Sequence, residues 1–301
     1  LQQLTYFITV FIAAPLAFVT GVMQGPAFSN KLDGFAKVLN RQLARTIHFV
    51  VLSWFLFFIF VHTILVFITG LRNNLNYMVA GVNNDSWTGL LIYIPVMVVL
   101  IIIWLMASPI TIRHARLIQR VGELLVGYIK SWAEYWDPGT QYREKDISPY
   151  FWVNGTLPTS EEYDTLRQGE FVDYKLTIGG LVENPQEITY AELKAMPKQE
   201  QITKHFCIQG WSGVAKWGGV PVRDILRMVK PKPEARYVVF YSFAEGADGG
   251  IYYDVHSIRN MRHKLSILAY EMNGETLSFL HGAPLRLRCE NQLGFKMVKW
   301  I

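Results

Sequence analysis

Residues 47–70 read IHFVVLSWFLFFIFVHTILVFITG and contain no Lys, Arg, Asp or Glu. At 1.5 Å of rise per residue, a helix of this length crosses the roughly 30 Å hydrocarbon core of a bilayer. Residues 4–23 and 90–107 are uncharged runs of the same kind, and hydrophobic residues make up 51% of the 301-residue chain. The sequence therefore predicts that the N-terminal half is a transmembrane α-helical bundle in contact with a lipid bilayer, with three of its helices present.

The run 47–70 contains two histidines, His48 and His62. They are 14 residues apart (62 − 48 = 14), close to four helical turns. They therefore share one helix face at a separation of about 21 Å. Because a polar residue inside a membrane span is a functional candidate, we interpret each as an axial ligand of one of two stacked haems. The alternative is a pair of histidines hydrogen-bonded between helices.

The two histidines cannot serve one haem, because the axial nitrogens of a haem are only roughly 4 Å apart. The other axial ligands are expected outside this segment, so we expect the bundle to be incomplete. This half resembles the di-haem b-type cytochrome subunits of formate dehydrogenases and hydrogenases. The resemblance rests on the spaced His48 and His62 pair. It implies two haem b groups that exchange electrons with quinone or another electron carrier. A haem-free membrane anchor is the alternative.

Basic residues flank the predicted spans unevenly. The segments after the first and third spans carry most of them: Lys31, Lys37, Arg41, Arg45, Arg113, Arg116, Arg120 and Lys130. The loop between the second and third spans carries only Arg72. Because Lys and Arg are enriched in cytoplasmic loops, we expect the C-terminal half on the cytoplasmic side of a bacterial inner membrane. The net charge of +5 then reflects topology, and no nucleic-acid partner is expected.

Residues 113–147 separate the membrane half from a more polar half. Apolar residues recur at helical spacing from Leu117, which predicts an amphipathic helix. It would lie along the membrane interface or pack against the polar half. Asp137-Pro-Gly ends this helix and begins a linker. We therefore divide the chain into a haem-b domain at 1–112, this connecting segment, and a third region at 148–301.

The third region reads as an α+β domain with mostly short strands. The signals are alternating or continuous apolar runs, a proline at a helix start and the hairpin dipeptide Asn-Gly. They predict strands at 174–182, 236–243 and 284–289, a hairpin around Asn273-Gly274, a helix capped by Thr189 and a helix opened by Pro221.

The chain has two cysteines, Cys207 and Cys289, so a disulfide framework and a Cys-rich metal site are excluded. Cys289 lies on an apolar strand, where a cysteine is usually a small buried hydrophobe. Cys207 lies in the segment HFCIQGWS, residues 205–212, before a Gly/Trp-rich turn. Such a turn can present a thiolate to a metal or a substrate.

Five segments around Cys207 occur together: ISPYFWVNG at 147–155, HFCIQGWS at 205–212, LAYEMNG at 268–274, HGAPLRL at 281–287 and GFKMVKW at 294–300. In this order they resemble the molybdopterin-binding domain of the sulfite oxidase family, which includes methionine sulfoxide reductases. The resemblance implies a molybdenum–molybdopterin cofactor, with the Cys207 thiolate as the protein ligand of the metal. It also implies seven cofactor-binding residues: Asn154, Ser242, His281, Arg286, Met297, Val298 and Lys299.

The residues around Cys207 also bear on the substrate. Sulfite oxidases have an arginine two residues before the cysteine, whereas this chain has His205, which argues against sulfite. Tyr253, of the pair Tyr252-Tyr253, is our candidate for the active-site tyrosine of the family, with a register uncertain by one residue. We expect Tyr253 and His205 to orient the substrate or carry protons. The structural alternative for either tyrosine is a half-buried strand aromatic.

Taken together, the sequence predicts a membrane-bound molybdenum oxidoreductase. Oxo transfer with a small-molecule substrate at the Cys207 centre would be coupled to electron transfer through b-type haems. The alternative is a metal-free binding or regulatory domain on a transmembrane electron-transfer cytochrome. The substrate and the direction of the reaction are not indicated by these residues.

Overall fold

The computed structural model describes residues 2–136, 141–246 and 249–301. The chain forms two compact units. The first consists of Leu1–Val22 and Leu43–Trp132, and the second of Met23–Gln42 and Ala133–Ile301. Residues 23–42 thus group with the C-terminal half, whereas we assigned them to the membrane domain. The predicted boundaries at 112 and 147 stay predictions, and the predicted break at Asp137-Pro-Gly lies outside the described residues.

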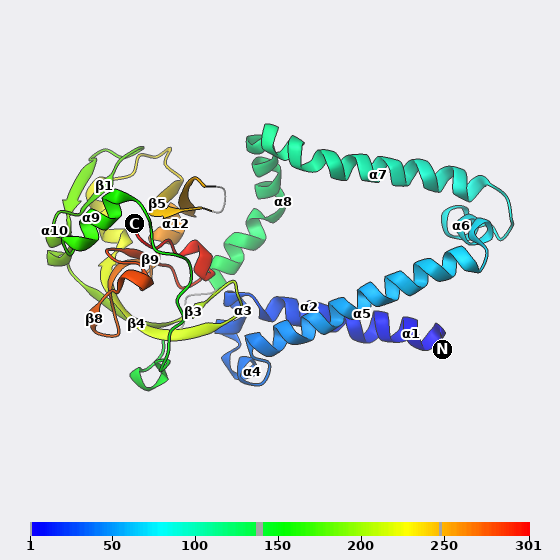
Figure 1. Ribbon diagram of the computed structural model, residues 1–301, viewed down its shortest axis with the longest axis horizontal. Helices are drawn as coiled ribbons and strands as arrows, with labels where there is room; N and C mark the ends of the chain where they lie inside the picture. Colours follow the sequence, from blue (N-terminus) through cyan, green and yellow to red (C-terminus); the bar gives the residue numbers. More distant parts are fainter. Residues whose placement is uncertain (1, 137–140, 247–248) are drawn as a thin grey trace. The chain divides into compact units, whose positions relative to one another are not determined.

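Long helices dominate the first unit (Figure 1). In chain order they are α1 (Gln2–Phe7), the π-helical segment η1 (Ile8–Ala13), α2 (Ala14–Met23), α5 (Arg41–Ile68), α6 (Leu71–Ala80), α7 (Thr88–Arg113) and α8 (Ala115–Trp136). In the described part of the chain, three stretches are long and apolar enough to cross a membrane: Gln2–Met23, Arg41–Ile68 and Thr88–Arg113. They contain the predicted runs 4–23 and 90–107 and all but the last two residues of 47–70. The bilayer itself remains an expectation from length and composition.

Helix α5 runs beside the α1–α2 stretch, as both Figure 1 and the contacts show. Tyr6 of α1 contacts His62, and Thr20 of α2 contacts His48. The two stretches are therefore antiparallel, and both histidines lie on the α5 face that meets α1–α2. The predicted amphipathic helix is present as α8, with exposed Leu124 and Leu125. The side chains of Arg116 and Lys130 on α8 lie outside the described residues.

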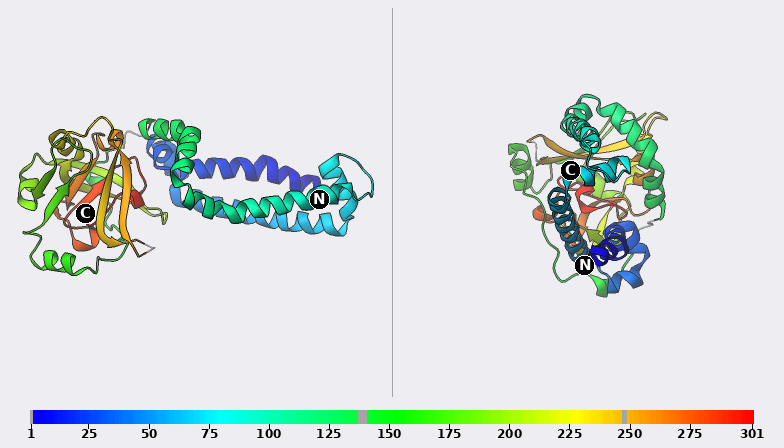
Figure 2. Two further views of the ribbon diagram at one scale, coloured as in Figure 1. Left: turned by 90° about the horizontal axis from the view of Figure 1, so that it is seen from above. Right: turned by 90° about the vertical axis from the view of Figure 1, so that its right-hand side faces the viewer.

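The second unit is rich in β-structure (Figure 2). A five-stranded antiparallel sheet contains β3 (Gln199–Phe206), β4 (Ser212–Pro221), β7 (Ile267–Met272), β8 (Glu275–Thr276) and β9 (Arg286–Arg288). Strand β4 lies between β3 and β7, and β7 also pairs with β8 and β9. Two hairpins stand apart: β1 (Lys175–Ile178) with β2 (Gln186–Thr189), and β5 (Tyr237–Glu245) with β6 (Ile251–Ser257).

Short helices make up the rest of this unit. The α-helices are α3 (Pro26–Lys31), α4 (Asp33–Val38), α9 (Glu161–Gln168), α10 (Tyr190–Ala195), α11 (Val222–Val229) and α12 (Ile258–Met261). The 3₁₀ turns are η2 (Glu144–Asp146), η3 (Phe279–His281) and η4 (Gly294–Lys296). The buried core of the unit includes Trp217 of β4 and Leu287 of β9, both fully enclosed. Apolar burial of this kind contributes most of the stabilising free energy of such a domain.

Several local predictions are confirmed. Thr189 caps α10, and its hydroxyl accepts the Glu192 N–H while the Glu192 carboxylate accepts the Thr189 N–H. Asn273 and Gly274 both have positive φ and join β7 to β8, as a two-residue hairpin turn requires. Helix α11 follows Pro221 as predicted, although Pro221 itself ends β4 and precedes the helix. The strands predicted at 174–182 and 284–289 are shorter than expected.

A glycine in the centre of the sheet permits a close approach between β4 and β7. The register shifts between Gly218 and Gly219. A Cβ added at Gly219 would lie 2.0 Å from the Leu268 carbonyl oxygen of β7. Any side chain there would force the strands apart. Gly179, by contrast, has nothing within 4 Å of an added Cβ and no positive φ.

We expect Gly219→Ala to lower the free energy of unfolding by about 1–3 kcal/mol, the usual cost of overpacking a filled interior. Gly179→Ala is the matched control and should change it little. Thermal unfolding of the detergent-solubilised chain, followed by circular dichroism, makes the comparison. Equal melting temperatures for the two variants would contradict the close contact of β4 with β7.

Candidate active site

Cys207 lies on the tight turn that joins β3 to β4. Its N–H donates to the Trp211 carbonyl (3.0 Å), and its own carbonyl accepts the Gly210 N–H (3.0 Å). Gly210 has a φ of 103°, which favours glycine. The Cys207 side chain is fully buried, and its sulfur accepts a hydrogen bond from Asn154 Nδ2 (3.3 Å). The two-strand hairpin thus holds the thiol in a fixed place beside Asn154.

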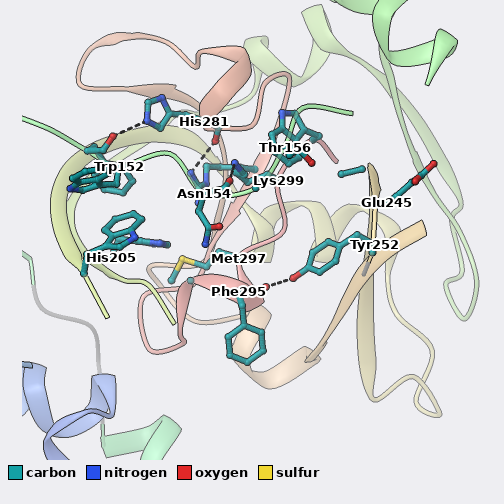
Figure 3. Close-up of a pocket in the computed structure, with 18 residues that line it drawn as sticks. Trp152, Asn154, Thr156, His205, Glu245, Tyr252, His281, Phe295, Met297 and Lys299 are labelled. Carbon is teal, nitrogen blue, oxygen red and sulfur yellow. Dashed lines mark hydrogen bonds between the residues drawn. The ribbon is translucent and has the colours of Figure 1, made fainter. Parts of the chain in front are cut away.

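A cavity of about 300 Å³ lies next to this turn (Figure 3). Six of the predicted site residues line it: Asn154, His205, His281, Arg286, Met297 and Lys299. They come from four separate parts of the sequence. Cys207 itself is not in the lining and is connected to the cavity through Asn154. The structure therefore brings the predicted thiol and most of the predicted cofactor contacts to one place.

Arg286 is a buried cation in the wall of this cavity. Its guanidinium donates to the His281 carbonyl (2.9 Å) and lies 4.9 Å from the centre of the Trp217 ring. Its Nε is buried and has no hydrogen-bond partner among the described residues. Burial, followed by the charge of Arg288, lowers the pKa of Arg286 to about 9. The group therefore remains protonated at neutral pH, with one donor left for a ligand.

Lys299 is the second cation at the cavity. Its Nζ donates to the carbonyls of Asn154 and Leu280, the latter at 3.0 Å. Burial, followed by the Arg286 charge, lowers the pKa of Lys299 to about 7. Neither Arg286 nor Lys299 forms an ion pair with a carboxylate in the described part of the chain. The cavity is therefore suited to an anionic ligand.

His205 is buried beside a carboxylate–guanidinium pair. Arg288 and Glu290 form a fully buried salt bridge of 2.8 Å, and Arg288 also donates to His205 Nδ1 (2.8 Å). A guanidinium can only donate, so Nδ1 is the acceptor and the neutral ring carries its proton on Nε2. Burial, followed by the Arg288 charge, holds the pKa of His205 well below its ordinary value. The neutral form of His205 is therefore favoured, and its expected roles in orienting the substrate or carrying protons stay predictions.

Gly294 lets η4 pass close to this imidazole. A Cβ at Gly294 would lie 2.4 Å from His205 Nε2. The Nε2–H group thus faces the backbone at the cavity edge. In Figure 3, His205 and Met297 lie on the same side of the cavity.

His281 lines the cavity, but both of its ring nitrogens have partners in the protein. Nε2 donates to the Phe151 carbonyl (3.3 Å), which can only accept, so Nδ1 accepts from the Ser278 hydroxyl (2.8 Å). Burial is the largest cause of its lowered pKa. His281 thus fixes the Phe151 segment, and any contact with a cofactor would use its ring face or backbone.

The structure brings Tyr252, and not Tyr253, to the cavity. The Tyr252 hydroxyl donates to the Phe295 carbonyl (Figure 3), while the Tyr253 side chain is 57% exposed. Neighbouring residues of a strand point to opposite faces, so Tyr252 replaces Tyr253 as the candidate tyrosine.

Ser242 and Val298, two of the predicted cofactor contacts, also lie outside the cavity lining. The Ser242 hydroxyl donates to the Lys299 carbonyl (2.7 Å), and the Val298 carbonyl accepts the Leu287 N–H (2.8 Å).

Sequence reasoning missed two features of the site. The first is the buried Arg288–Glu290 ion pair. Two opposite charges at the end of a predicted apolar strand could have indicated it. The second is Arg41, which we counted only as a loop charge. Arg41 is buried, donates to the Cys207 carbonyl (2.6 Å) and lies 5.7 Å from the Phe206 ring centre. No local pattern signals a contact between residues so far apart in the chain.

Comparison with known proteins identifies the C-terminal part of the chain. Residues 164–301 match the family model of the oxidoreductase molybdopterin binding domain. A protein of Azospira oryzae, named as subunit YedZ1 of a protein-methionine-sulfoxide reductase, is 33% identical over 157 residues, 52% of this chain and 58% of that protein. The catalytic subunit MsrP of a protein-methionine-sulfoxide reductase from Xanthomonas axonopodis pv. citri is 32% identical over 173 residues, 53% of each chain.

Among solved structures, the sulfane dehydrogenase SoxCD from Paracoccus pantotrophus aligns with a TM-score of 0.38 and 28% identity, over 43% of this chain and 36% of that chain. The chain spans between 53% and 58% of the length of the two curated relatives above. Residues 164–301 are thus similar to oxidoreductase molybdopterin-binding domains, among them that of MsrP. The predicted resemblance is supported for residues 164–301, whereas the predicted domain start at residue 148 stays a prediction.

The lowered pKa of Lys299 predicts a pH-dependent stability of the cofactor-free protein. The unfolded value is about 10.4, so between about pH 7 and pH 10.4 the unfolded state binds more protons. Stability should therefore rise with pH across this range, by up to about 1.4 kcal/mol per pH unit. Lys299→Met should reduce this slope, whereas Lys232→Met, at an exposed lysine, should keep it. Melting temperatures from pH 7 to 10 test this, and equal slopes in both variants would contradict it.

Proposed function

We propose that this chain is part of a membrane-bound molybdenum oxidoreductase that couples oxo transfer on a small substrate to electron transfer through b-type haems and quinone. The observation that carries the proposal is the cavity of the second unit. It places the buried Arg286 and the half-buried Lys299 beside the buried Cys207 thiol. Such a site suits a ligand that is both anionic and able to bind a thiolate.

The residues present match the chemistry of a molybdopterin cofactor. The phosphate of this cofactor requires charged hydrogen-bond donors. The buried Nε–H of Arg286 has no hydrogen-bond acceptor among the described residues, so it is available to donate to that phosphate. Lys299 supplies a second positive charge. Asn154 contacts both the thiol, through Nδ2, and Lys299, through its carbonyl. Arg286 and Lys299 would hold the phosphate, and Cys207 would bind molybdenum as the thiolate.

The cofactor supplies the oxygen-atom transfer chemistry when it is bound. The chain supplies binding and orientation. His205, held by Arg288 as a neutral imidazole, would offer an Nε2–H donor at the cavity edge beside Gly294. Tyr252 holds the Phe295 turn and so fixes the position of the neighbouring Gly294 beside His205. Trp152 and Trp211 add aromatic side chains to the cavity lining.

A sulfoxide suits this arrangement as substrate. Two relatives are named as protein-methionine-sulfoxide reductase subunits. A sulfoxide oxygen is a neutral hydrogen-bond acceptor, and His205 offers one neutral donor at the position where sulfite oxidases have a charged arginine. We therefore propose reduction of a sulfoxide to a thioether, with the oxygen leaving as water after uptake of two protons and two electrons.

The first unit supports a haem-binding role through His48 and His62. Both imidazoles lie on one face of α5 and are partly exposed. Each uses Nδ1 for a hydrogen bond to a hydroxyl, and neither Nε2 has a partner among the described residues. This is the arrangement of a ligating histidine, which binds metal through one nitrogen and a polar partner through the other. We propose one haem b at each histidine and, from the loop charges, a catalytic domain on the cytoplasmic side.

Replacing Arg286 should prevent retention of the cofactor. We expect Arg286→Met to reduce molybdenum per purified chain by about tenfold or more, since a charge-assisted hydrogen bond contributes about 1.5–3 kcal/mol. The melting temperature of the cofactor-free Arg286→Met protein should fall little, because the substitution removes a buried charge that has no ion-pair partner in the described part of the chain. The control is Arg236→Met, at an exposed arginine. Molybdenum absent from the wild-type protein would favour the metal-free regulatory alternative.

Replacing each histidine tests the haem assignment. We expect His48→Leu and His62→Leu each to remove roughly half of the iron and of the reduced b-type absorbance, because each loses one axial ligand. The double variant should have neither. Metal analysis and visible spectroscopy of the purified full-length protein measure this. Unchanged haem content in both single variants would show that other residues bind the haems, and haem-free wild-type protein would leave the first unit as an anchor.

A further inference from the structure

The α1–α2 stretch presents two hydroxyl groups to the two histidines of α5. Tyr6 Oη lies 3.2 Å from His62 Nδ1, and Thr20 Oγ1 lies 2.9 Å from His48 Nδ1. The hydroxyls are 14 residues apart (20 − 6 = 14), and so are the histidines (62 − 48 = 14). Two antiparallel stretches with equal spacings bring both pairs into contact at once. Each candidate haem ligand therefore has its own hydroxyl partner.

The Thr20 hydroxyl fixes the direction of its hydrogen bond. It lies 2.5 Å from the Leu16 carbonyl and 3.3 Å from the Ala17 carbonyl. A carbonyl only accepts, and two oxygens at 2.5 Å need a proton between them, so the single hydroxyl proton points to Leu16. The Thr20 oxygen must therefore accept from His48 Nδ1–H. Nδ1 carries the proton, and Nε2 keeps its lone pair.

Packing holds the same imidazole edge against α2. A Cβ added at Gly21 would lie 3.6 Å from His48 Cε1, an ordinary contact distance. Tyr6 gives a less defined arrangement at the other histidine. Its hydroxyl has no second hydrogen-bond partner among the described residues, so the direction of the bond to His62 Nδ1 is not set by the protein alone. His62 is instead stacked on Phe58, with ring centres 5.7 Å apart.

We propose that Thr20 is a positioning residue that holds His48 in the one tautomer able to bind a haem iron through Nε2. The inference rests on the proposed haem function. It distinguishes the two haem sites, because the protein fixes the tautomer of His48 but not that of His62. An Nδ1–H group that donates to an acceptor makes the imidazole a more basic ligand. A more basic ligand favours the oxidised iron. The Thr20 oxygen therefore lowers the midpoint potential of the haem bound by His48.

The test is a redox titration of the purified full-length protein, monitored by haem absorbance. Thr20→Val preserves the shape of the side chain but removes the acceptor, so one of the two midpoint potentials should rise while the other stays unchanged. Thr20→Ser retains a hydroxyl and should behave as wild type. Thr9→Val is the matched control, because Thr9 Oγ1 accepts from Trp54 Nε1 (3.1 Å) on the same pair of helices without touching a histidine.

Each outcome has one meaning. An upward shift confined to one haem in Thr20→Val, or loss of that haem with both retained in Thr20→Ser, supports the proposal. Unchanged potentials in Thr20→Val, or the same shift in Thr9→Val, overturn it while leaving the haem function intact. Wild-type protein without haem overturns the haem function itself, and this inference with it.

Discussion

Uncompensated positive charge in a buried cavity is the constraint on which the second unit depends. Arg288 has the Glu290 carboxylate as its partner, at 2.8 Å. Arg286 is buried and Lys299 half-buried in the same region, and neither forms an ion pair with a carboxylate in the described part of the chain. Burial, followed by the charge of a neighbouring arginine, lowers the pKa of each. Burying an unpaired charge is costly. A fold that tolerates this cost is one whose stable form contains an anion, and a phosphate-bearing cofactor meets that need.

The sheet turns this requirement into geometry. Arg286 and Arg288 are two residues apart on strand β9. Both guanidinium groups lie over the Trp217 ring of β4, at 4.9 and 4.3 Å from its centre. The same strand β4 follows the turn that carries Cys207. Strands β4 and β9 of this one sheet therefore fix the positions of the Cys207 thiol, of Arg286, and of Arg288, which is the hydrogen-bond partner of His205. Precise placement of this kind is what electrostatic control of a bound metal requires.

Much of this arrangement could be predicted from the sequence, because its signals are local. Uncharged runs predicted the three long helices, and Asn273-Gly274 predicted its hairpin. The choice between Tyr252 and Tyr253 could not be made in this way, since a shift of one residue along a strand reverses the face. Two other features could not be predicted: both His281 ring nitrogens form hydrogen bonds, and Arg41 contacts the Cys207 turn. Both include contacts between segments that are distant in the sequence, and sequence periodicity gives no signal for such contacts.

The bond between Cys207 and molybdenum is the central claim of this account. X-ray absorption at the molybdenum edge of the purified full-length protein measures it directly. Cys207→Ser should lose one sulfur neighbour of molybdenum relative to wild type, whereas Cys289→Ser, at the buried thiol that follows β9, should keep the wild-type spectrum. An unchanged sulfur shell in Cys207→Ser would contradict the assignment of this thiol as the metal ligand.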